Sequence, residues 1–249
     1  MEIGVYGLGR FGTFWAKQLS RYHTVKGYNR SPKNSLDFPI ELVSEEEVLN
    51  CEAVMLCVTI DSLEAVLKRI SPLLAKGCTV IDTCSVKVYP SLLMEKLLPP
   101  QINIIATHPM FGPDSGKHGI KGLPLVYCPI RGSQELFATW EKVFANMELN
   151  VLPMSCDDHD KEAAYSQGVT HFVGRVLDQL QLKKTELATV GYTNLLAIVE
   201  QTCNDPLQLF YDLQRYNPYA KQMHLQLQQA LDHVLHILQE QDEKGLKLP

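Results

Sequence analysis

The chain has 249 residues, of which 45% are hydrophobic and 20% charged, and its formal net charge is −5. This length and composition suit an enzyme with one large domain or two modest ones. The negative balance offers no basic face for nucleic acid, and no apolar run approaches the ~18 residues of a membrane span. We therefore expect no nucleic-acid or membrane partner. Because the chain begins directly with an apolar strand, we also expect no signal peptide and a cytoplasmic location.

The amino terminus carries a glycine-rich turn between a short strand and a helix. Residues 1–6 form an apolar strand, and residues 10–21 have the periodicity of an amphipathic helix. The turn between them has the pattern GxGxxG, which in this context is typical of a dinucleotide-binding site, because the helix amino terminus and close backbone approach favour a pyrophosphate. The predicted cofactor-binding residues of this turn are Gly7, Leu8, Gly9, Arg10, Phe11 and Gly12.

The next strand, predicted over residues 24–28, ends in Asn29-Arg30-Ser31. A site for NAD would place Asp or Glu about twenty residues after the glycine turn, to bind the ribose hydroxyls. Here no carboxylate is present, and Arg30 and Ser31 can both contact a 2′-phosphate. Arg30 is equally explicable as a solvated loop charge. The missing acid favours NADP as the cofactor, with NAD as the alternative.

Apolar strand-like runs then alternate with helical periodicity. We expect strands at 53–58, 79–82, 102–106, 123–127 and 150–153, and helices at 63–74, 91–98 and 135–147. This alternation predicts an α/β fold in which a Rossmann-type, doubly wound and largely parallel sheet occupies residues 1–154. The last strand–helix–strand unit adds to the same sheet.

Polar residues follow two of these strands where a ligand would lie. Ser85 follows the strand at 79–82, with Lys87 just behind it. His108 follows the apolar run 102–106 and precedes a Pro/Gly-rich loop, so we expect it at the carboxyl end of a strand, where open α/β sheets bind ligands. His108 has the character of a catalytic base.

Beyond residue 155 only helical patterns occur. We expect helices at 161–182, 186–201, 206–216 and 218–238, which makes residues 155–249 an all-helical domain for substrate binding and dimerisation. The last helix carries an apolar stripe too rich for a single exposed helix, and we predict that it forms a homodimer. The stripe consists of Leu225, Leu227, Leu231, Val234, Leu235 and Leu238.

Two histidines of this region are further candidates. His159 lies in the run Asp158-His159-Asp160, and His171 follows about three helical turns later, so the two need not share a face. An exposed position at a helix start is an equal interpretation for His159. For His171, which apolar residues flank, the competing interpretation is a core histidine.

The seven cysteines are scattered and include no CxxC pair. An odd number at irregular spacing indicates reduced, mostly buried thiols in a cytosolic protein, and neither a disulfide framework nor a metal site. They are Cys51, Cys57, Cys78, Cys84, Cys128, Cys156 and Cys203.

Several segments share a family likeness: Gly7-Leu8-Gly9, Ser85-Val86-Lys87, residues 107–117 (THPMFGPDSGK) and residues 155–177 (SCDDHDKEAAYSQGVTHFVGRVL). Together they resemble the prephenate/arogenate dehydrogenase family, the TyrA enzymes of tyrosine biosynthesis, and most of all its short, plant-like arogenate dehydrogenases. The stretch from Gly191 to Asn217 also looks like the helical domain of the family.

This resemblance implies an NAD(P)-dependent oxidative decarboxylation. His108 matches the catalytic histidine of the family, and Ser85 matches the serine that hydrogen-bonds with it and with the substrate hydroxyl. His171 matches a substrate-binding histidine. A neutral imidazole, with its ordinary pKa near 6.5, suits the removal of the hydroxyl proton.

One departure concerns the substrate carboxylates. Bacterial members carry an arginine five residues before an Asp-Pro pair, and the equivalent position before Asp205-Pro206 is Glu200. A dianionic substrate still requires a cation, because an unpaired buried carboxylate is costly. Lys117 and Arg215 rank first by position, ahead of Lys121 and Arg175.

A second departure concerns substrate choice. Plant-like members use an acid in the segment equivalent to 206–213, where this chain aligns Gln208. A neutral residue removes the preference for the ammonium group of arogenate, so we predict prephenate as the substrate, with arogenate as the alternative. Asp205 and Asp212 lie near enough to replace that acid if the register differs by a turn.

Two other classes share some of these features. A different NADP enzyme, such as a β-hydroxyacid dehydrogenase or an imine reductase, would have both domains but no use for His108. A sensor that binds NADPH without catalysis would use its histidines structurally, and the pair Ser85 and His108 argues against it.

Overall fold

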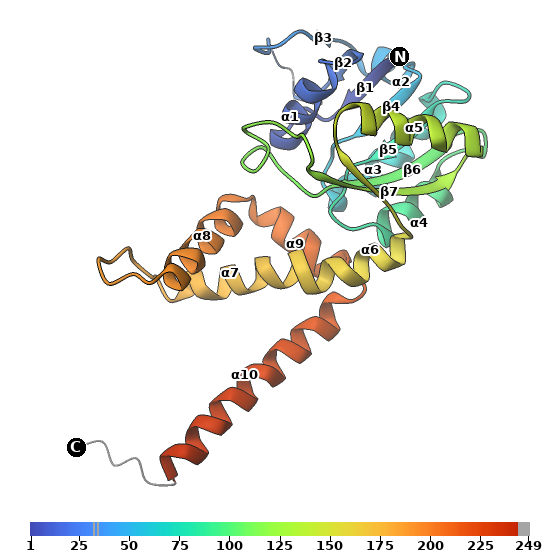
Figure 1. Cartoon of the computed structure of the whole chain (residues 1–249). Coiled ribbons are helices and arrows are strands. Elements are labelled where there is room, and N and C mark those ends of the chain that lie inside the picture. The colour runs from blue at the N-terminus through green and yellow to red at the C-terminus, as the bar shows by residue number, and fades with distance from the viewer. Residues whose placement is uncertain (32, 34, 244–249) are drawn as a thin grey trace. The chain divides into compact units, whose positions relative to one another are not determined.

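The computed structural model describes residues 1–31, 33 and 35–243, and the chain divides into two compact units, Met1–Asp160 and Lys161–Pro249 (Figure 1). Helix α6 (Cys156–Ala163) spans this division, whereas the predicted boundary after residue 154 assigns it wholly to the second domain. Residues 244–249 of the predicted second domain lie outside the described residues.

The described part of the first unit contains one eight-stranded sheet in the order β3-β2-β1-β4-β5-β6-β7-β8. β7 is antiparallel to β6, with an irregular register between Ile104 and Ile105, and the other neighbours are parallel. The strands are β1 (Glu2–Tyr6), β2 (Thr24–Tyr28), β3 (Glu41–Leu42), β4 (Ala53–Leu56), β5 (Thr79–Asp82), β6 (Asn103–Pro109), β7 (Pro124–Arg131) and β8 (Asn150–Pro153). The doubly wound, largely parallel sheet predicted from the alternation is confirmed.

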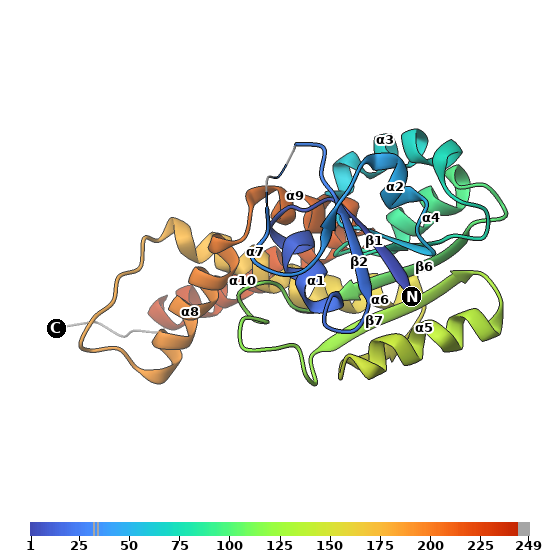
Figure 2. The same cartoon turned by 90° about the horizontal axis from the view of Figure 1, so that it is seen from above.

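Helices cover both faces of this sheet. α1 (Arg10–Leu19) and α5 (Gln134–Asn146) lie on one face, and α2 (Glu45–Leu49), α3 (Ile60–Ile70) and α4 (Val88–Leu97) lie on the other (Figure 2). Trp15 of α1 and Trp140 of α5 are fully buried in the apolar cluster of the first face. Burial of aromatic side chains of this size contributes about 2–3 kcal/mol each, so these helices are held by their apolar stripes.

The described part of the second unit is helical. It consists of the end of α6, a π-helical turn η2 (Ala164–Gly168), α7 (Val169–Gln179), α8 (Val190–Asn204), α9 (Leu207–Tyr216) and α10 (Ala220–Glu243). α7 and α8 pack closely, because a Cβ on Gly174 would lie 2.1 Å from the Thr202 hydroxyl oxygen. None of the helices in the described part of the chain is both long and apolar enough to span a membrane.

Most predicted elements are present, with differences at the ends and in the weakest patterns. Residues 24–28, 79–82 and 150–153 form strands with the predicted bounds. The predicted helix 161–182 begins earlier and is interrupted by η2. β3 and α2 were missed because each is very short.

The cysteines are free thiols, four of them buried and three partly buried. Burial raises the pKa of both Cys57 and Cys78 to about 12, so these thiols stay protonated at neutral pH.

Candidate active site

The carboxyl ends of four parallel strands share one edge of the sheet. β1, β4, β5 and β6 are neighbours in register and end at Tyr6, Leu56, Asp82 and Pro109. The strand order reverses between β1 and β4, and ligands bind at such switch points in open α/β sheets. The glycine turn and His108 therefore belong to the same edge.

The glycine turn has the backbone geometry that a dinucleotide requires. Gly7 has a φ of 102°, which favours glycine, and a Cβ there would lie 2.5 Å from the Cys57 carbonyl oxygen. A Cβ on Gly12 would lie 1.8 Å from the Gly7 carbonyl oxygen, so only glycine permits this close approach of α1 to the turn. A Cβ on Gly9 would meet nothing within 4 Å, which leaves open space before the first-turn N–H groups of α1.

The end of β2 supports this turn through a side-chain amide. The Asn29 side-chain oxygen accepts the Leu8 N–H at 2.9 Å, and its amide nitrogen donates to the Ser31 carbonyl at 2.8 Å. Arg30 and Ser31 are exposed. Lys33, which the sequence analysis did not single out, brings a second cation here by donating to the Thr13 hydroxyl at 3.4 Å. Just beyond the end of β2 the chain thus carries two cations, Arg30 and Lys33.

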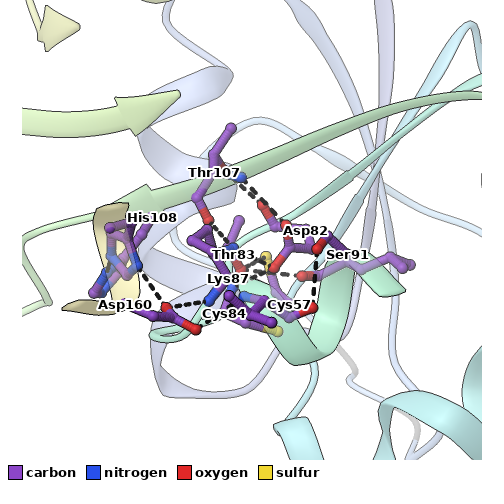
Figure 3. A network of polar contacts seen from close by, with 12 residues as sticks. Cys57, Asp82, Thr83, Cys84, Lys87, Ser91, Thr107, His108 and Asp160 are labelled. Carbon is purple, nitrogen blue, oxygen red and sulfur yellow. Dashed lines mark hydrogen bonds and ion pairs between the residues drawn. The ribbon is translucent and has the colours of Figure 1, made fainter. Parts of the chain in front are cut away.

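A fully buried ion pair lies at the ends of β5 and β6 (Figure 3). The Lys87 ammonium contacts Asp82 Oδ2 at 2.5 Å and donates to the Thr107 carbonyl at 2.6 Å. Asp82 also accepts the backbone N–H groups of Cys84 and Thr107, at 3.0 and 3.2 Å. Burial works to lower the pKa of Lys87, but the Asp82 carboxylate outweighs it and the pKa is raised.

Ser85 lies inside the turn that this ion pair closes. Its side chain is buried, and its hydroxyl oxygen has no hydrogen-bond partner among the described residues. An unpaired buried hydroxyl is costly, and it is expected where a ligand completes the bonding. The arrangement suits the predicted contact with a substrate hydroxyl.

His108 lies inside β6 rather than just after it, in register with Val126 of β7, and only 4% of it is exposed. Burial lowers the pKa of this imidazole well below its ordinary value, and the neighbouring His159 and Lys87 lower it further. His108 is therefore neutral at pH 7, which is the state that a general base requires.

The loop after β6 packs on α1. The Phe111 ring contacts Phe14 and Trp15, with ring centroids 6.3 and 6.1 Å apart. Arg10 pairs with Asp114 of the same loop at 2.6 Å. These contacts connect the His108 loop to the helix that starts at the glycine turn.

His159 and Asp160 are buried beside His108. His159 is 2% exposed and Asp160 is 0% exposed, so the interpretation of His159 as an exposed residue at a helix start is wrong. The His108 Nδ1 and His159 Nε2 atoms are 2.9 Å apart, and His159 Nδ1 lies 2.8 Å from Asp160 Oδ1. Figure 3 shows Asp160 between His108 and the Lys87 turn.

His171 is buried in the helical unit. Its Nε2 atom lies 4.0 Å from Asp205 Oδ2, and its Nδ1 atom has no partner among the described residues. Burial lowers its pKa, while Asp205 opposes and Arg175 reinforces that shift. Arg175 donates to the carbonyls of Thr202 and Asp205 at 3.1 and 3.0 Å, which caps the end of α8.

The remaining predicted substrate-binding residues have varied surroundings. The Gln208 side chain donates to Asp212 Oδ1 at 2.8 Å, and Asp212 is buried. Lys117 and Arg215 are exposed. Lys121 pairs with Glu148 at 2.5 Å on the surface.

Sequence reasoning missed the partners that organise the site. Asp82, Thr107 and Asp160 bind Lys87 or its turn, yet the sequence assigned none of them a role. The available signal was an acid at the end of a strand with a lysine five residues later. Nothing in the spacing indicated that Asp160 would reach this turn.

Together, a dinucleotide-binding turn and a buried neutral imidazole at one sheet edge define a Rossmann-type oxidoreductase. Comparison with protein families agrees. Residues 15–145 match the nucleotide-binding domain of prephenate dehydrogenase, and residues 176–248 match the TYRAAT1-like C-terminal domain.

Arogenate dehydrogenase 2, chloroplastic, of Arabidopsis thaliana is 38% identical over 94% of this chain and 69% of its own length. A probable arogenate/prephenate dehydrogenase of Methanocaldococcus jannaschii is 26% identical over 97% of the chain and 57% of its own length. The crystal structure of prephenate dehydrogenase from A. aeolicus, with hydroxyphenyl propionate and NAD+, has a similar fold, with a TM-score of 0.75 at 19% identity over 98% of this chain and 92% of that one.

The chain belongs to the TyrA family of NAD(P)-dependent prephenate/arogenate dehydrogenases, enzymes of tyrosine biosynthesis. Membership in this family sets aside the other reductases and the non-catalytic sensor.

The buried ion pair generates a stability prediction. We expect Lys87→Met to lower the free energy of unfolding by about 3–5 kcal/mol, because it leaves the Asp82 carboxylate buried without a cation. The double variant Asp82→Asn/Lys87→Met should lose less than the sum of the two single losses. Urea unfolding measures the free energy of unfolding of Lys87→Met, of Asp82→Asn and of the double variant.

The control is the surface pair Lys121–Glu148, whose side chains are 78% and 53% exposed. Lys121→Met should cost less than about 1 kcal/mol. Additive losses at Asp82 and Lys87, or equal losses for Lys87→Met and Lys121→Met, would contradict the account of the buried pair.

Proposed function

We propose that this enzyme is an arogenate dehydrogenase that uses NADP and produces tyrosine, carbon dioxide and NADPH. The support is that two plant relatives carry the name arogenate dehydrogenase, the second being 37% identical over 88% of this chain and 36% of its own length. They favour arogenate over prephenate, the substrate that Gln208 had predicted. Prephenate, whose oxidation yields 4-hydroxyphenylpyruvate, is the second candidate substrate.

The proposed chemistry rests on one observation. His108 is buried and neutral, and it lies at the same edge of the sheet as the glycine turn. His108 accepts the proton of the ring hydroxyl while hydride leaves the carbon that carries this hydroxyl. The bound nicotinamide supplies the hydride acceptor. The bond to the ring carboxylate then breaks, its electron pair enters the ring as carbon dioxide leaves, and the phenolate oxygen takes the proton back from His108. Ser85 donates its unpaired hydroxyl to the same oxygen.

The helical unit supports the choice of arogenate. Arogenate differs from prephenate by an ammonium group, which a carboxylate binds well. Asp205 lies beside the buried His171, and its side chain is 25% exposed. We assign the ammonium to Asp205 and a substrate contact to His171. Gln208 is a neighbour of Asp212 one turn further along α9, and we assign it a supporting role.

The substrate carboxylates require a cation. Lys117 and Arg215 keep this assignment, since both are exposed and Lys121 is paired with Glu148. Arg175 has its guanidinium bound to two carbonyls, which favours a structural role.

The cofactor proposal depends on the end of β2. The turn contributes Gly7, Leu8, Gly9, Arg10, Phe11 and Gly12, and the strand end contributes Asn29, Arg30 and Ser31. Asn29 stands where a site for NAD would carry an acid, and its side chain accepts the Leu8 N–H of the turn. Arg30 and Lys33 supply positive charge for a 2′-phosphate. NAD is the alternative cofactor.

We further propose a homodimer formed through α10, with a dinucleotide-binding domain of residues 1–154 and a helical substrate and dimerisation domain of residues 155–249. Leu225, Leu231 and Leu238 of α10 are each more than half exposed, which a second copy would cover. The partners are then the substrate and a second copy, with neither nucleic acid nor membrane. The cytoplasmic location stays a prediction beside the chloroplastic names of the plant relatives.

A four-way activity assay tests the substrate and the cofactor. We expect the fastest nicotinamide reduction with arogenate and NADP, among the four pairings of arogenate or prephenate with NADP or NAD. Asp205→Asn should lower kcat/KM for arogenate about tenfold or more and leave prephenate little changed, because the ammonium loses a charged partner. Arg30→Glu should weaken the binding of NADP and leave the binding of NAD little changed.

Asp61→Asn and Arg21→Glu are the matched controls, since both residues are exposed elsewhere in the chain. Faster turnover of prephenate would restore Gln208 as the determinant of substrate choice. Absence of turnover in all four pairings would reject the proposed function.

The pKa of His108 predicts the acid limb of the pH profile. Because only the neutral imidazole accepts a proton and its pKa is lowered, kcat/KM should stay constant from pH 8 to below 6.5 and fall only at more acidic pH. His108→Ala should lower kcat by about 10²–10⁴-fold. The exposed His118 offers a control, and His118→Ala should change neither value. A fall with a midpoint at or above pH 6.5 would contradict the assignment.

A further inference from the structure

The run Asp158-His159-Asp160 has no part in the chemistry described so far, although two of its members are buried against the proposed base. His159 comes from α6 and His108 from β6, 51 residues apart in the chain. Buried polar side chains are retained where their hydrogen bonds are complete. The contacts of this group constrain where each ring proton lies.

Asp160 is the fixed end of the group. Its Oδ1 atom accepts the Lys87 N–H at 2.7 Å, and its Oδ2 atom accepts the Val88 N–H at 2.9 Å, at the start of α4. A helix amino terminus favours a negative charge, and backbone N–H groups can only donate. Asp160 is therefore held as an acceptor, and the ring nitrogen that contacts its Oδ1 atom has to donate.

The protons of both imidazoles follow from this constraint. His159 Nδ1 lies 2.8 Å from Asp160 Oδ1 and carries a hydrogen. With His159 neutral, this ring carries a single N–H, so its Nε2 atom is an acceptor. His108 Nδ1, 2.9 Å away, then has to donate. The His108 Nε2 atom is left with its lone pair, which is the atom able to take a proton from a substrate hydroxyl.

We propose that His159 and Asp160 are positioning residues that hold His108 in the Nδ1–H tautomer, so that its Nε2 atom is the proton acceptor. This inference rests on the proposed function, in which His108 is the base. The opposite tautomer would place two lone pairs against each other between the rings. Once His108 is protonated, its Nδ1–H bond to His159 persists, and Asp160 stabilises the charge through His159.

The same ion-pair turn makes this arrangement rigid. Asp160 binds the backbone of Lys87, whose ammonium in turn binds Asp82 and the carbonyl of Thr107, the residue before His108. The turn around Lys87 thus holds both the His159–Asp160 pair and the strand that carries the base (Figure 3).

Two substitutions of His159 separate its role as an acceptor from its bulk. His159→Leu fills the site without an acceptor, whereas the side-chain oxygen of His159→Gln reaches the position of Nε2 and can accept from His108. We expect His159→Leu and Asp160→Asn to lower kcat about 10²–10⁴-fold with little change in KM, by analogy with removal of the orienting acid in a catalytic triad. His159→Gln should keep kcat within about tenfold of the unsubstituted enzyme. Asp158→Asn, a neighbouring exposed acid, should have no effect.

A spectroscopic measurement reads the tautomer without turnover. The protein with ¹⁵N-labelled histidine, compared with its His108→Ala variant, identifies the His108 ring signals. We expect the Nδ1–H tautomer in the unsubstituted protein and in His159→Gln, and the Nε2–H tautomer or a mixture in His159→Leu. Circular dichroism and thermal melting check that each variant is folded.

Three results would overturn the proposal: an Nε2–H tautomer in the unsubstituted protein, an unchanged kcat in folded His159→Leu, or equal losses in His159→Leu and His159→Gln. An active His108→Ala variant would instead reject the proposed base. In that case the tautomer signals of the other variants would still show whether His159 and Asp160 hold the His108 tautomer. Failure of the proposed base and failure of the positioning role can therefore be distinguished.

Discussion

The buried ion pair between Asp82 and Lys87 is the contact on which the site depends. Its members come from the end of β5 and the turn before α4, and it reaches β6 through the carbonyl of Thr107. Two fully buried charges are tolerated only when they are paired and hydrogen-bonded, so the turn has little freedom to move. The turn carries Ser85, and its backbone binds Asp160. This ion pair therefore positions the Ser85 hydroxyl and the His108 imidazole. It also positions the His159 and Asp160 side chains that contact His108.

The sheet places this constraint beside the cofactor turn. Parallel pairing of β1, β4, β5 and β6 brings their carboxyl ends to one edge. The loop after His108 then packs its Phe111 ring against Phe14 and Trp15 of α1. Because α1 begins at the glycine turn, the proposed base and the proposed hydride acceptor are supported by contacts within a single compact unit.

The sequence predicted what local pattern determines. The glycine turn, the strands and His108 are read from neighbours in the chain, since turn geometry and apolar periodicity act over a few residues. The burial of His159 depends on a contact across 51 residues, and its spacing predicted an exposed position equally well. Substrate choice was inferred from Gln208, with Asp205 and Asp212 as alternatives. In the folded unit Gln208 donates to Asp212, and Asp205 lies beside His171. Contacts formed only by folding, such as Asp160 with the Lys87 turn, left no signal in the spacing.

In the proposed site, His108 accepts the proton of the reacting hydroxyl at its Nε2 atom. A crystal structure of the enzyme with NADP+ and a ligand that carries a 4-hydroxyphenyl ring tests it most directly. We expect the phenol oxygen within about 3.2 Å of both His108 Nε2 and Ser85 Oγ, with His108 Nδ1 still bound to His159. A phenol oxygen placed away from His108, or an imidazole turned so that Nδ1 faces the ligand, would contradict it.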